Sequence, residues 1–308
     1  AATPGAPQGS HLGPPPLNIF INDIVDIIKV DSLLFADDVK LYSSVESEVD
    51  CLNLQCGLDA VKSWCLQNDM TLNINKSSCI TFHRTKSPIY FNYTLDGALL
   101  SRSNIVRDLG IVLSEDLTPH EHINNICARA AKALGFITRS STDFHDPTVL
   151  GTLHCTLVRP LLEYSCVMWS PHQVTLVRQI QSIQDKFIRL FGCRLGFAYR
   201  DVPLRLIEEE LGLCSLETRR SIQGVMFLHK LITGGIVCPE ILRGVFFRCP
   251  MGTRSSELFG RRHVGSNYEA NSTLIRIQRL GNIVSPHVDF FADSVTVVKK
   301  KTVNALVL

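Results

Sequence analysis

The feature that most constrains the fold is the stretch 32–42, in which two short apolar runs meet at a pair of adjacent aspartates. The runs contain Leu, Phe, Val and Tyr over lengths typical of β-strands, and Asp37 and Asp38 lie between them. Two such runs around a polar break predict a β-hairpin with the aspartates at its turn. The sheet that contains this hairpin therefore carries a carboxylate pair at one end.

The aspartate pair has two interpretations. Asp-Asp is common in solvated turns, and the pair taken alone favours that interpretation. Adjacent carboxylates repel each other, however, so a fold that presents Asp37 and Asp38 between buried strands gains most when a cation binds there. Hard divalent ions with oxygen ligands fit best, Mg2+ first and Mn2+ as a substitute. Two-metal phosphoryl transfer requires a carboxylate cluster of this kind.

Composition limits the class of protein. The chain has 308 residues, 45% of them hydrophobic and 19% charged, so it can bury one large or two modest cores. No apolar run approaches the length of a membrane span, and no signal-peptide pattern opens the chain. The net charge of +2 requires any basic surface to be local. The 11 cysteines include no C-x-x-C pair and are interpreted as reduced, mostly buried thiols of an intracellular protein.

The expected elements change in character near residue 118. Before it, the pattern predicts helices over 17–28 and from the capping residue Ser47 to Gln67. The expected strands, besides the aspartate hairpin, are 71–75 and 79–82 around Lys76, a hairpin at Asp96-Gly97, and 108–113.

After residue 118 the periodicity predicts helices. The first begins at the capping box Thr118-Pro119-His120-Glu121 and runs to Ile137. Residues beyond 235 are weakly periodic, and we expect them to be loosely ordered. The fold class is therefore α+β, with a short antiparallel sheet and helices followed by an all-helical region. The other expected helices are 147–168 with a kink at Pro160, 174–191 with Gly192 as its stop, 202–211 and 216–232.

With its apolar left flank, Phe35-Ala36-Asp37-Asp38 resembles the catalytic-turn motif of reverse transcriptases, most closely those of non-LTR retrotransposons of the jockey and CR1 type. The tetrapeptide alone is moderately specific for this family. Its position in an ordered series of matching segments is much stronger evidence for the resemblance. Pro15-Pro16 departs from the family pattern, and the resemblance continues to about Val284. The matching segments are the nucleotide-pocket motif at 5–14, two further palm motifs at 64–82 and 108–111, and the segments 159–164 and 169–171 that follow the palm.

The resemblance implies a domain organisation and a function. Residues 1–114 would form part of the palm of a reverse-transcriptase domain, 115–195 a helical thumb, and 196–308 a helical C-terminal region with a loosely ordered tail. The implied activity is RNA-directed DNA polymerisation, a two-metal nucleotidyl transfer to a primer 3′-hydroxyl. The implied partners are an RNA template, a DNA primer and deoxynucleotides, without a membrane, in the nucleus and cytoplasm. The oligomeric state is left open.

The resemblance also assigns site residues. Asp37 and Asp38 would hold Mg2+ or Mn2+, and Lys76 would stabilise or protonate the departing pyrophosphate. The remaining assignments are Gln8 and Gly9 for the incoming nucleotide, and Gly110, Arg178, Lys186 and Arg189 for primer and nucleic-acid contact.

Each of these assignments competes with a plainer explanation. Residues 1–16 could be a flexible tail, Lys76 a solvated turn lysine, and Gly110 a bulge glycine. The cations of the helix over 174–191 could belong to an ordinary solvated face.

The chain opens inside a recognisable motif and without Met, so it is interpreted as the C-terminal fragment of a polymerase. The family's third metal-binding aspartate, its fingers and its endonuclease domain are not recognised in it, and we expect little or no activity from the chain alone. The alternative, from a different class, is a non-catalytic transposon remnant or a helical nucleic-acid-binding module.

Overall fold

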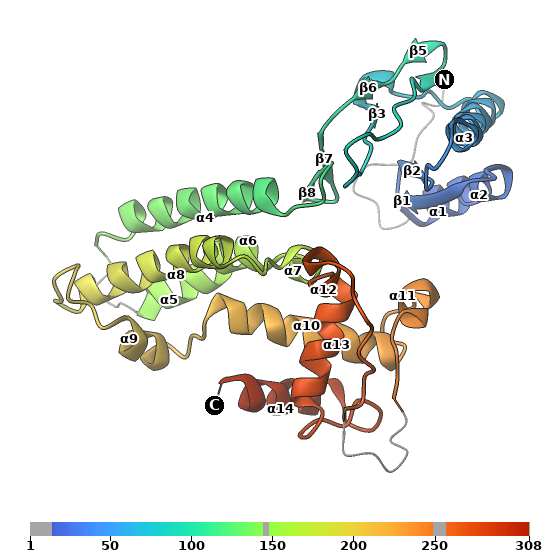
Figure 1. Cartoon of the computed structure of the whole chain (residues 1–308). Helices are drawn as coiled ribbons and strands as arrows, with labels where there is room; N and C mark the ends of the chain where they lie inside the picture. The colour runs from blue at the N-terminus through green and yellow to red at the C-terminus, as the bar shows by residue number, and fades with distance from the viewer. Residues whose placement is uncertain (1–13, 144–147, 249–256, 308) are drawn as a thin grey trace. The chain divides into compact units, whose positions relative to one another are not determined.

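The computed structural model describes residues 14–143, 148–248 and 257–307 (Figure 1). These residues form two compact units, the first containing the described residues up to 107 with 113–118 and the second containing 108–112 with the described residues from 119 onward. The first unit combines helices with short strands, and the described part of the second is helical apart from the ends of two strands and an isolated β-bridge. The α+β class is confirmed.

Three α-helices pack the first unit. Ser47 is the predicted capping residue of the longest helix of this unit, and it forms a capping box with Asp50, whose carboxylate accepts the Ser47 backbone N–H at 2.8 Å. Trp64 lies at the centre of one core and donates its indole N–H to Asp23 at 3.1 Å. The expected single helix over 17–28 is instead two helices. The bounds are α1 Pro14–Ile21, α2 Ile24–Ile27 and α3 Glu48–Gln67.

The strands form four separate two-stranded sheets in the described part of the chain. The expectation of one short antiparallel sheet is therefore wrong in two respects, because the strands are divided and the β3–β6 pair is parallel. The hairpin at Asp96-Gly97 is confirmed as β4–β5. The bounds are β1 Asp31–Phe35, β2 Asp38–Tyr42, β3 Ser78–Cys79, β4 Thr94–Leu95, β5 Ala98–Leu99, β6 Ser101–Arg102, β7 Ile105–Asp108 and β8 Ile111–Ser114.

The strand predicted over 71–75 does not form. Ile74–Lys76 is a single 3-10 turn, η1, and the Asn73 side chain accepts the Lys76 backbone N–H. An asparagine side chain that bonds its own local backbone offers the chain an alternative to a sheet ladder. The strand predicted over 108–113 is also divided, because Leu109 and Gly110 form the β7–β8 turn with φ of 44° and 86°.

One core of the second unit is built around Phe187, which is fully buried among side chains of α4 to α10. The helix predicted after Thr118 is confirmed as α4, but the predicted capping box is wrong. The N-cap position is Pro119, no side chain caps the helix, and the Thr118 hydroxyl donates to Asp116 instead. The helices are α4 His120–Ser140, α5 Thr148–Leu153, the π-helix η2 His154–Val158, α6 Arg159–Glu163, α7 Cys166–Trp169, α8 Val174–Arg194, α9 Leu204–Glu210 and α10 Leu216–Ile232.

Two predicted helix interruptions lie elsewhere. Pro160 falls at the start of α6, which directly follows the π-helix η2, and the helical run breaks at Ser165, whose φ is 49°. Gly192 lies inside α8 rather than ending it. A Cβ at Gly192 would lie 2.6 Å from a methyl carbon of Val202, so close packing requires this glycine. The turn after α8 uses Gly196, whose φ is 96°.

Residues 257–307 are ordered, contrary to the expected loose tail. Four helices follow α10, and α10 packs against both α13 and α14. A second core includes Leu228 of α10, Ile277 of α13 and Phe290. The bounds are α11 Pro239–Arg243, α12 Asn267–Ala270, α13 Thr273–Val284 and α14 Val295–Val307.

None of the helices among the described residues is long and apolar enough to cross a membrane. The ten cysteines of the described part are all free, and they range from buried to exposed rather than being mostly buried.

Candidate functional site

The aspartate pair lies at the tip of the β1–β2 hairpin, as the sequence pattern predicts. Phe35 pairs with Asp38 at the end of the ladder, which leaves Ala36 and Asp37 as a two-residue loop. Ala36 has a φ of 52°, in the left-handed region that residues with a Cβ rarely adopt. The tip thus holds backbone strain next to the carboxylates, a combination that is common at functional sites.

Both carboxylates of the pair are exposed to solvent. Within the described residues, neither Asp37 nor Asp38 has a hydrogen-bond or ion-pair partner. Asp50 and Asp116 differ in this respect: the Asp50 carboxylate accepts from Ser47 and Glu46, and the Asp116 carboxylate accepts from Ser114 and Thr118. The oxygens of Asp50 and Asp116 serve local structure, whereas those of the hairpin pair are available to a ligand.

One face of the hairpin packs on α3 through a glycine. Leu34 and Leu41 contact the core around Trp64. A Cβ at Gly57 of α3 would lie 2.6 Å from a methyl carbon of Val30 and 3.4 Å from one of Leu41. Gly57 therefore lets the hairpin approach the helix closely, and it is a positioning residue that the sequence analysis missed. Its signal was a glycine inside a helical pattern, where glycine costs about 1 kcal/mol relative to alanine.

The other face of the hairpin mixes apolar and charged side chains. Strand alternation and the register place Leu33, Phe35 and Tyr42 on this face together with Asp31, Lys40 and Asp38. The three apolar side chains are at least half exposed. Asp38 thus lies beside exposed apolar side chains.

The residues at the tip fit a hard divalent cation in donor type. Carboxylate oxygens are the ligands that Mg2+ prefers, and it keeps several waters when only one or two carboxylates bind it. The described residues contain no group of three or more His, Cys, Asp or Glu side chains arranged to hold a metal. Two carboxylates alone therefore predict weak, largely hydrated binding.

Lys76 is exposed in the η1 turn. Within the described residues, no hydrogen bond or ion pair joins it to Asp37 or Asp38. Gln8 and Gly9 lie outside the described residues. The roles assigned to these three positions stay predictions.

Gly110 lies in the second unit beside Tyr164. The Tyr164 hydroxyl donates to the Leu109 carbonyl at 3.0 Å, and a Cβ at Gly110 would lie 3.3 Å from the Tyr164 ring. The glycine is a turn glycine rather than a bulge glycine, and its open side faces a tyrosine. Tyr164 holds this turn in place, and nothing in the sequence pattern pointed to that contact.

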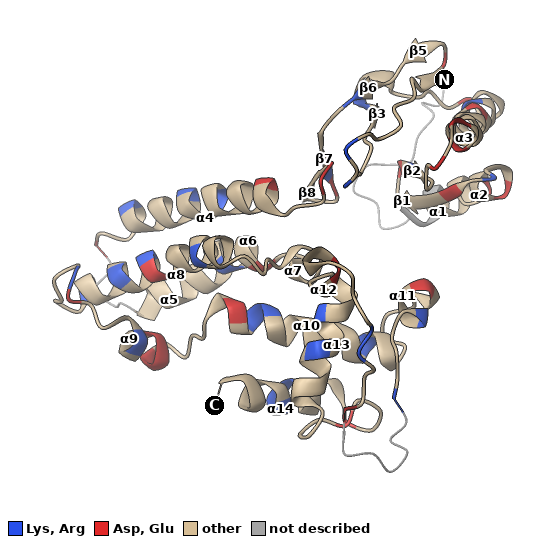
Figure 2. Cartoon of the chain, in the orientation of Figure 1, with Lys and Arg blue, Asp and Glu red and all other residues tan. Residues whose placement is uncertain are grey.

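The three predicted cations of α8 occupy one side of the helix. At about 100° per residue, Arg178, Lys186 and Arg189 fall within an arc of about 80°. Arg178 and Lys186 are exposed, whereas Arg189 donates to the Tyr199 carbonyl at 3.0 Å and lies over its ring. Figure 2 shows that Lys and Arg recur along α8 and also along α4.

Comparison with known proteins supports the resemblance. Residues 1–138 match the family described as reverse transcriptase (RNA-dependent DNA polymerase). The chain is 27% identical over 227 residues to the probable RNA-directed DNA polymerase from transposon BS of Drosophila melanogaster, a match covering 67% of this chain and 25% of the relative. It is 26% identical over 222 residues to the RNA-directed DNA polymerase from mobile element jockey of Drosophila funebris, covering 68% and 24%. No solved structure matches the chain.

This chain therefore matches the reverse-transcriptase family over residues 1–138, a segment that includes the aspartate pair of the β1–β2 hairpin. Its relatives are encoded by transposons, which confirms the resemblance to the enzymes of non-LTR retrotransposons. The chain spans about a quarter of the length of these relatives.

Proposed function

We propose that the chain supplies the metal-binding carboxylate pair of an RNA-directed DNA polymerase. The observation that carries this proposal is the position of Asp37 and Asp38, exposed and without partners among the described residues, at the strained tip of a hairpin fixed on α3. In this function the bound divalent cations supply charge that aligns a primer 3′-hydroxyl with the α-phosphate of a deoxynucleotide.

The chain's own residues then bind and orient the reactants. Asp37 and Asp38 hold the cation charge at the hairpin tip, and Lys76 offers a positive charge to the departing pyrophosphate. Gln8 and Gly9 are the proposed nucleotide contacts. The turn at Gly110 and the cations of α8 are proposed to contact the primer and the duplex backbone, with residues 1–114 as palm and 115–195 as thumb.

We also propose that these 308 residues need a further carboxylate and a fingers segment from elsewhere in a polymerase. Two observations support this. Among the described residues no third carboxylate joins the pair at the hairpin tip, and the curated relatives are about four times longer than the part matched here. Positioning and metal charge account for most of the rate of phosphoryl transfer, so the chain alone should extend primers little or not at all.

The test is primer extension on an RNA template with Mg2+ and all four deoxynucleotides. It compares the 308-residue chain with a fusion that adds an upstream reverse-transcriptase segment from a related element. We expect extension from the fusion only. In the fusion, Asp37→Asn should lower the rate by on the order of a thousandfold, about 4 kcal/mol of transition-state stabilisation.

The matched control is Asp31→Asn, because Asp31 is an exposed carboxylate at the opposite end of the same hairpin. It removes the same charge and should leave the rate unchanged. Equal losses from both variants would show a general charge effect and refute a metal site at the tip. A folded but silent fusion would favour the non-catalytic alternative, in which the basic side of α8 binds nucleic acid without chemistry.

A further inference from the structure

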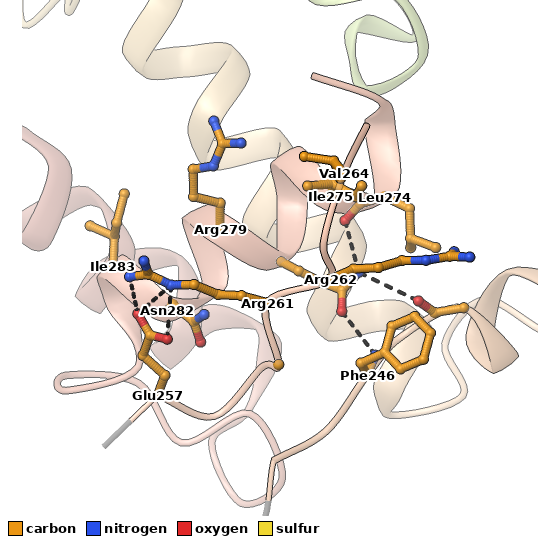
Figure 3. Close-up of a pocket in the computed structure, with 13 residues that line it drawn as sticks. Phe246, Glu257, Arg261, Arg262, Val264, Leu274, Ile275, Arg279, Asn282 and Ile283 are labelled. Atoms are coloured by element: carbon orange, nitrogen blue, oxygen red, sulfur yellow. Dashed lines mark hydrogen bonds and ion pairs between the residues drawn. The ribbon is translucent and has the colours of Figure 1, made fainter. Parts of the chain in front are cut away.

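A cavity of about 400 Å³ lies in the second unit, outside the segments discussed so far. Its walls are α13 on one side and the segments 244–246 and 257–264 on the other (Figure 3). The lining includes three arginines, Arg261, Arg262 and Arg279, together with the aromatic ring of Phe246. No proposed step of polymerisation uses this region.

Two amide side chains on α13 hold the walls in place. The Gln278 side chain accepts the Phe246 backbone N–H at 2.9 Å and donates to the Leu274 carbonyl at 3.1 Å. One turn later, the Asn282 side chain accepts the Phe259 N–H at 2.8 Å and donates to its carbonyl at 2.9 Å. The cavity is therefore a built feature with satisfied walls rather than a gap between loose segments.

The surrounding sequence is much more basic than the rest of the chain. Residues 239–285 contain seven arginines and three glutamates, with no lysine or aspartate, so their formal charge is +4. The whole chain has a net charge of only +2. Three of these arginines line the cavity, which favours an anionic ligand there.

Two of the three lining arginines are free of carboxylates among the described residues. Arg261 pairs with Glu257 and is neutralised. Arg262 instead lies over the Phe246 ring, with its guanidinium carbon 5.7 Å from the ring centre, and Arg279 donates to the Ala270 carbonyl at 2.8 Å. In Figure 3 the three guanidinium groups extend in different directions. Cations spread around a rim in this way suit a ligand with repeated negative charges better than one small anion.

The interior offers an apolar and aromatic surface. Val264, Leu274, Ile275 and Ile283 contribute to the lining, and the Phe246 ring is 45% exposed. An exposed aromatic ring with an arginine on it is a platform on which a nucleobase can stack, at any sequence.

We propose that this cavity binds single-stranded nucleic acid. One unpaired base enters beside Phe246, and the flanking phosphates contact Arg262 and Arg279. The site is separate from the aspartate hairpin and does not depend on it, so it would operate whether or not the chain polymerises DNA.

The first test measures binding of a fluorescein-labelled U12 oligonucleotide by anisotropy, with the full chain, without divalent metal, over a range of salt concentrations. Each phosphate contact adds about 0.7 to the slope of log affinity against log salt for single strands. Arg262→Ala with Arg279→Ala should reduce the slope by about 1.4, whereas Arg262→Lys with Arg279→Lys should keep it. The matched control, Arg205→Ala, removes an exposed arginine of α9 and should change nothing. An unchanged slope in the double alanine variant would overturn the proposal.

The second test concerns the base. Phe246→Leu should weaken U12 binding by about fivefold or more, because stacking is lost, and leave the salt slope as it was. A dodecamer of glutamate should displace U12 poorly; equal displacement would identify an acidic-peptide site and refute the proposal. In the unaltered chain, 4-thiouridine in the oligonucleotide should crosslink to the peptide that contains Phe246. Crosslinks found only in other peptides would overturn the proposal without any variant.

Discussion

The β1–β2 hairpin and the helical core around Phe187 use polar groups in opposite ways. At the hairpin, two carboxylates and two large apolar side chains, Leu33 and Phe35, are left in solvent. In the core, His154 is fully buried and stacks on Phe187 with ring centres 4.0 Å apart. Both ring nitrogens of His154 lack a hydrogen-bond partner among the described residues. The core around Phe187 therefore buries a polar side chain to complete its packing, whereas the hairpin leaves apolar and acidic side chains exposed.

This difference predicts that stability resides in the core and chemistry in the hairpin. The same substitution, Phe→Ala, made once in the core and once in the hairpin, should show the largest difference in the free energy of unfolding. Phe187→Ala should lower the free energy of unfolding by about 3–5 kcal/mol, because it leaves a large cavity in a closed core. Phe35→Ala should change it by no more than about 0.5 kcal/mol, since the ring is already exposed. Urea unfolding followed by circular dichroism measures both, and similar losses would contradict the comparison.

Acid should lower the stability of the core around Phe187. Burial, with a smaller contribution from Arg159, lowers the pKa of His154 to about 4. The pKa of His154 is lower in the folded protein than in the unfolded chain, so between about pH 6.5 and pH 4 protons bind the unfolded chain preferentially. The folded state is therefore fully stable above about pH 6.5 and loses stability as the pH falls towards 4. The loss approaches about 3 kcal/mol.

The measurement is the difference between the chain and His154→Phe in urea unfolding at pH 7 and pH 4.5. Phenylalanine keeps the stack on Phe187 and has no proton to bind, so the variant should lose less stability on acidification. Equal losses would place the acid sensitivity in other groups.

Substitution of Gly57, which lets the hairpin pack closely on α3, should have a smaller effect on the free energy of unfolding. Gly57→Ala should cost about 1–2 kcal/mol, because the new methyl group meets Val30, although alanine is the better helix former. Combining it with Val30→Ala should remove most of that steric cost. Gly135→Ala in α4 is the control: its Cβ would meet only an arginine nitrogen at 3.4 Å, so it should stabilise by up to about 1 kcal/mol. Stabilisation by Gly57→Ala would refute the close approach.

The smallest effect on stability should come from the pair itself. Asp37→Asn should change the free energy of unfolding by less than about 0.5 kcal/mol, because the side chain has no described partner to lose. Mn2+ titration by calorimetry should nevertheless show weak binding that this variant abolishes and Asp31→Asn retains. If Mn2+ still bound to the Asp37→Asn variant, the aspartate pair would be interpreted as an ordinary solvated turn.

The sequence predicted those features that depend on neighbouring residues. The apolar runs around Asp37 and Asp38 indicated the hairpin, and the capping residue Ser47 indicated the start of α3. The strand over 71–75 failed for a local reason, the bond from the Lys76 N–H to the Asn73 side chain. Other predictions failed where a distant contact decides the outcome. Gly192 stays helical because Val202 packs on it, and Gly57 is needed because Val30 packs on it.

The candidate site shows the same division. Its carboxylates could be found from their local pattern and from the resemblance. Tyr164 could not, because its hydroxyl bonds a carbonyl 55 residues earlier in the chain. The fold of residues 257–307 was missed since weak periodicity hid helices that are fixed by the shared core with α10.

The hydrogen bonds of Gln278 and Asn282 constrain the order in which this region can fold during translation. They bond backbone groups that left the ribosome 32 and 23 residues earlier. Until α13 has emerged, the Phe246 and Phe259 backbones have neither of these partners, and the arginine-lined cavity has no walls. A nascent chain arrested before Thr273 would therefore present Phe246, Phe247 and Phe259 to chaperones rather than to nucleic acid. The cavity is thus one of the last features of this unit to be completed during translation.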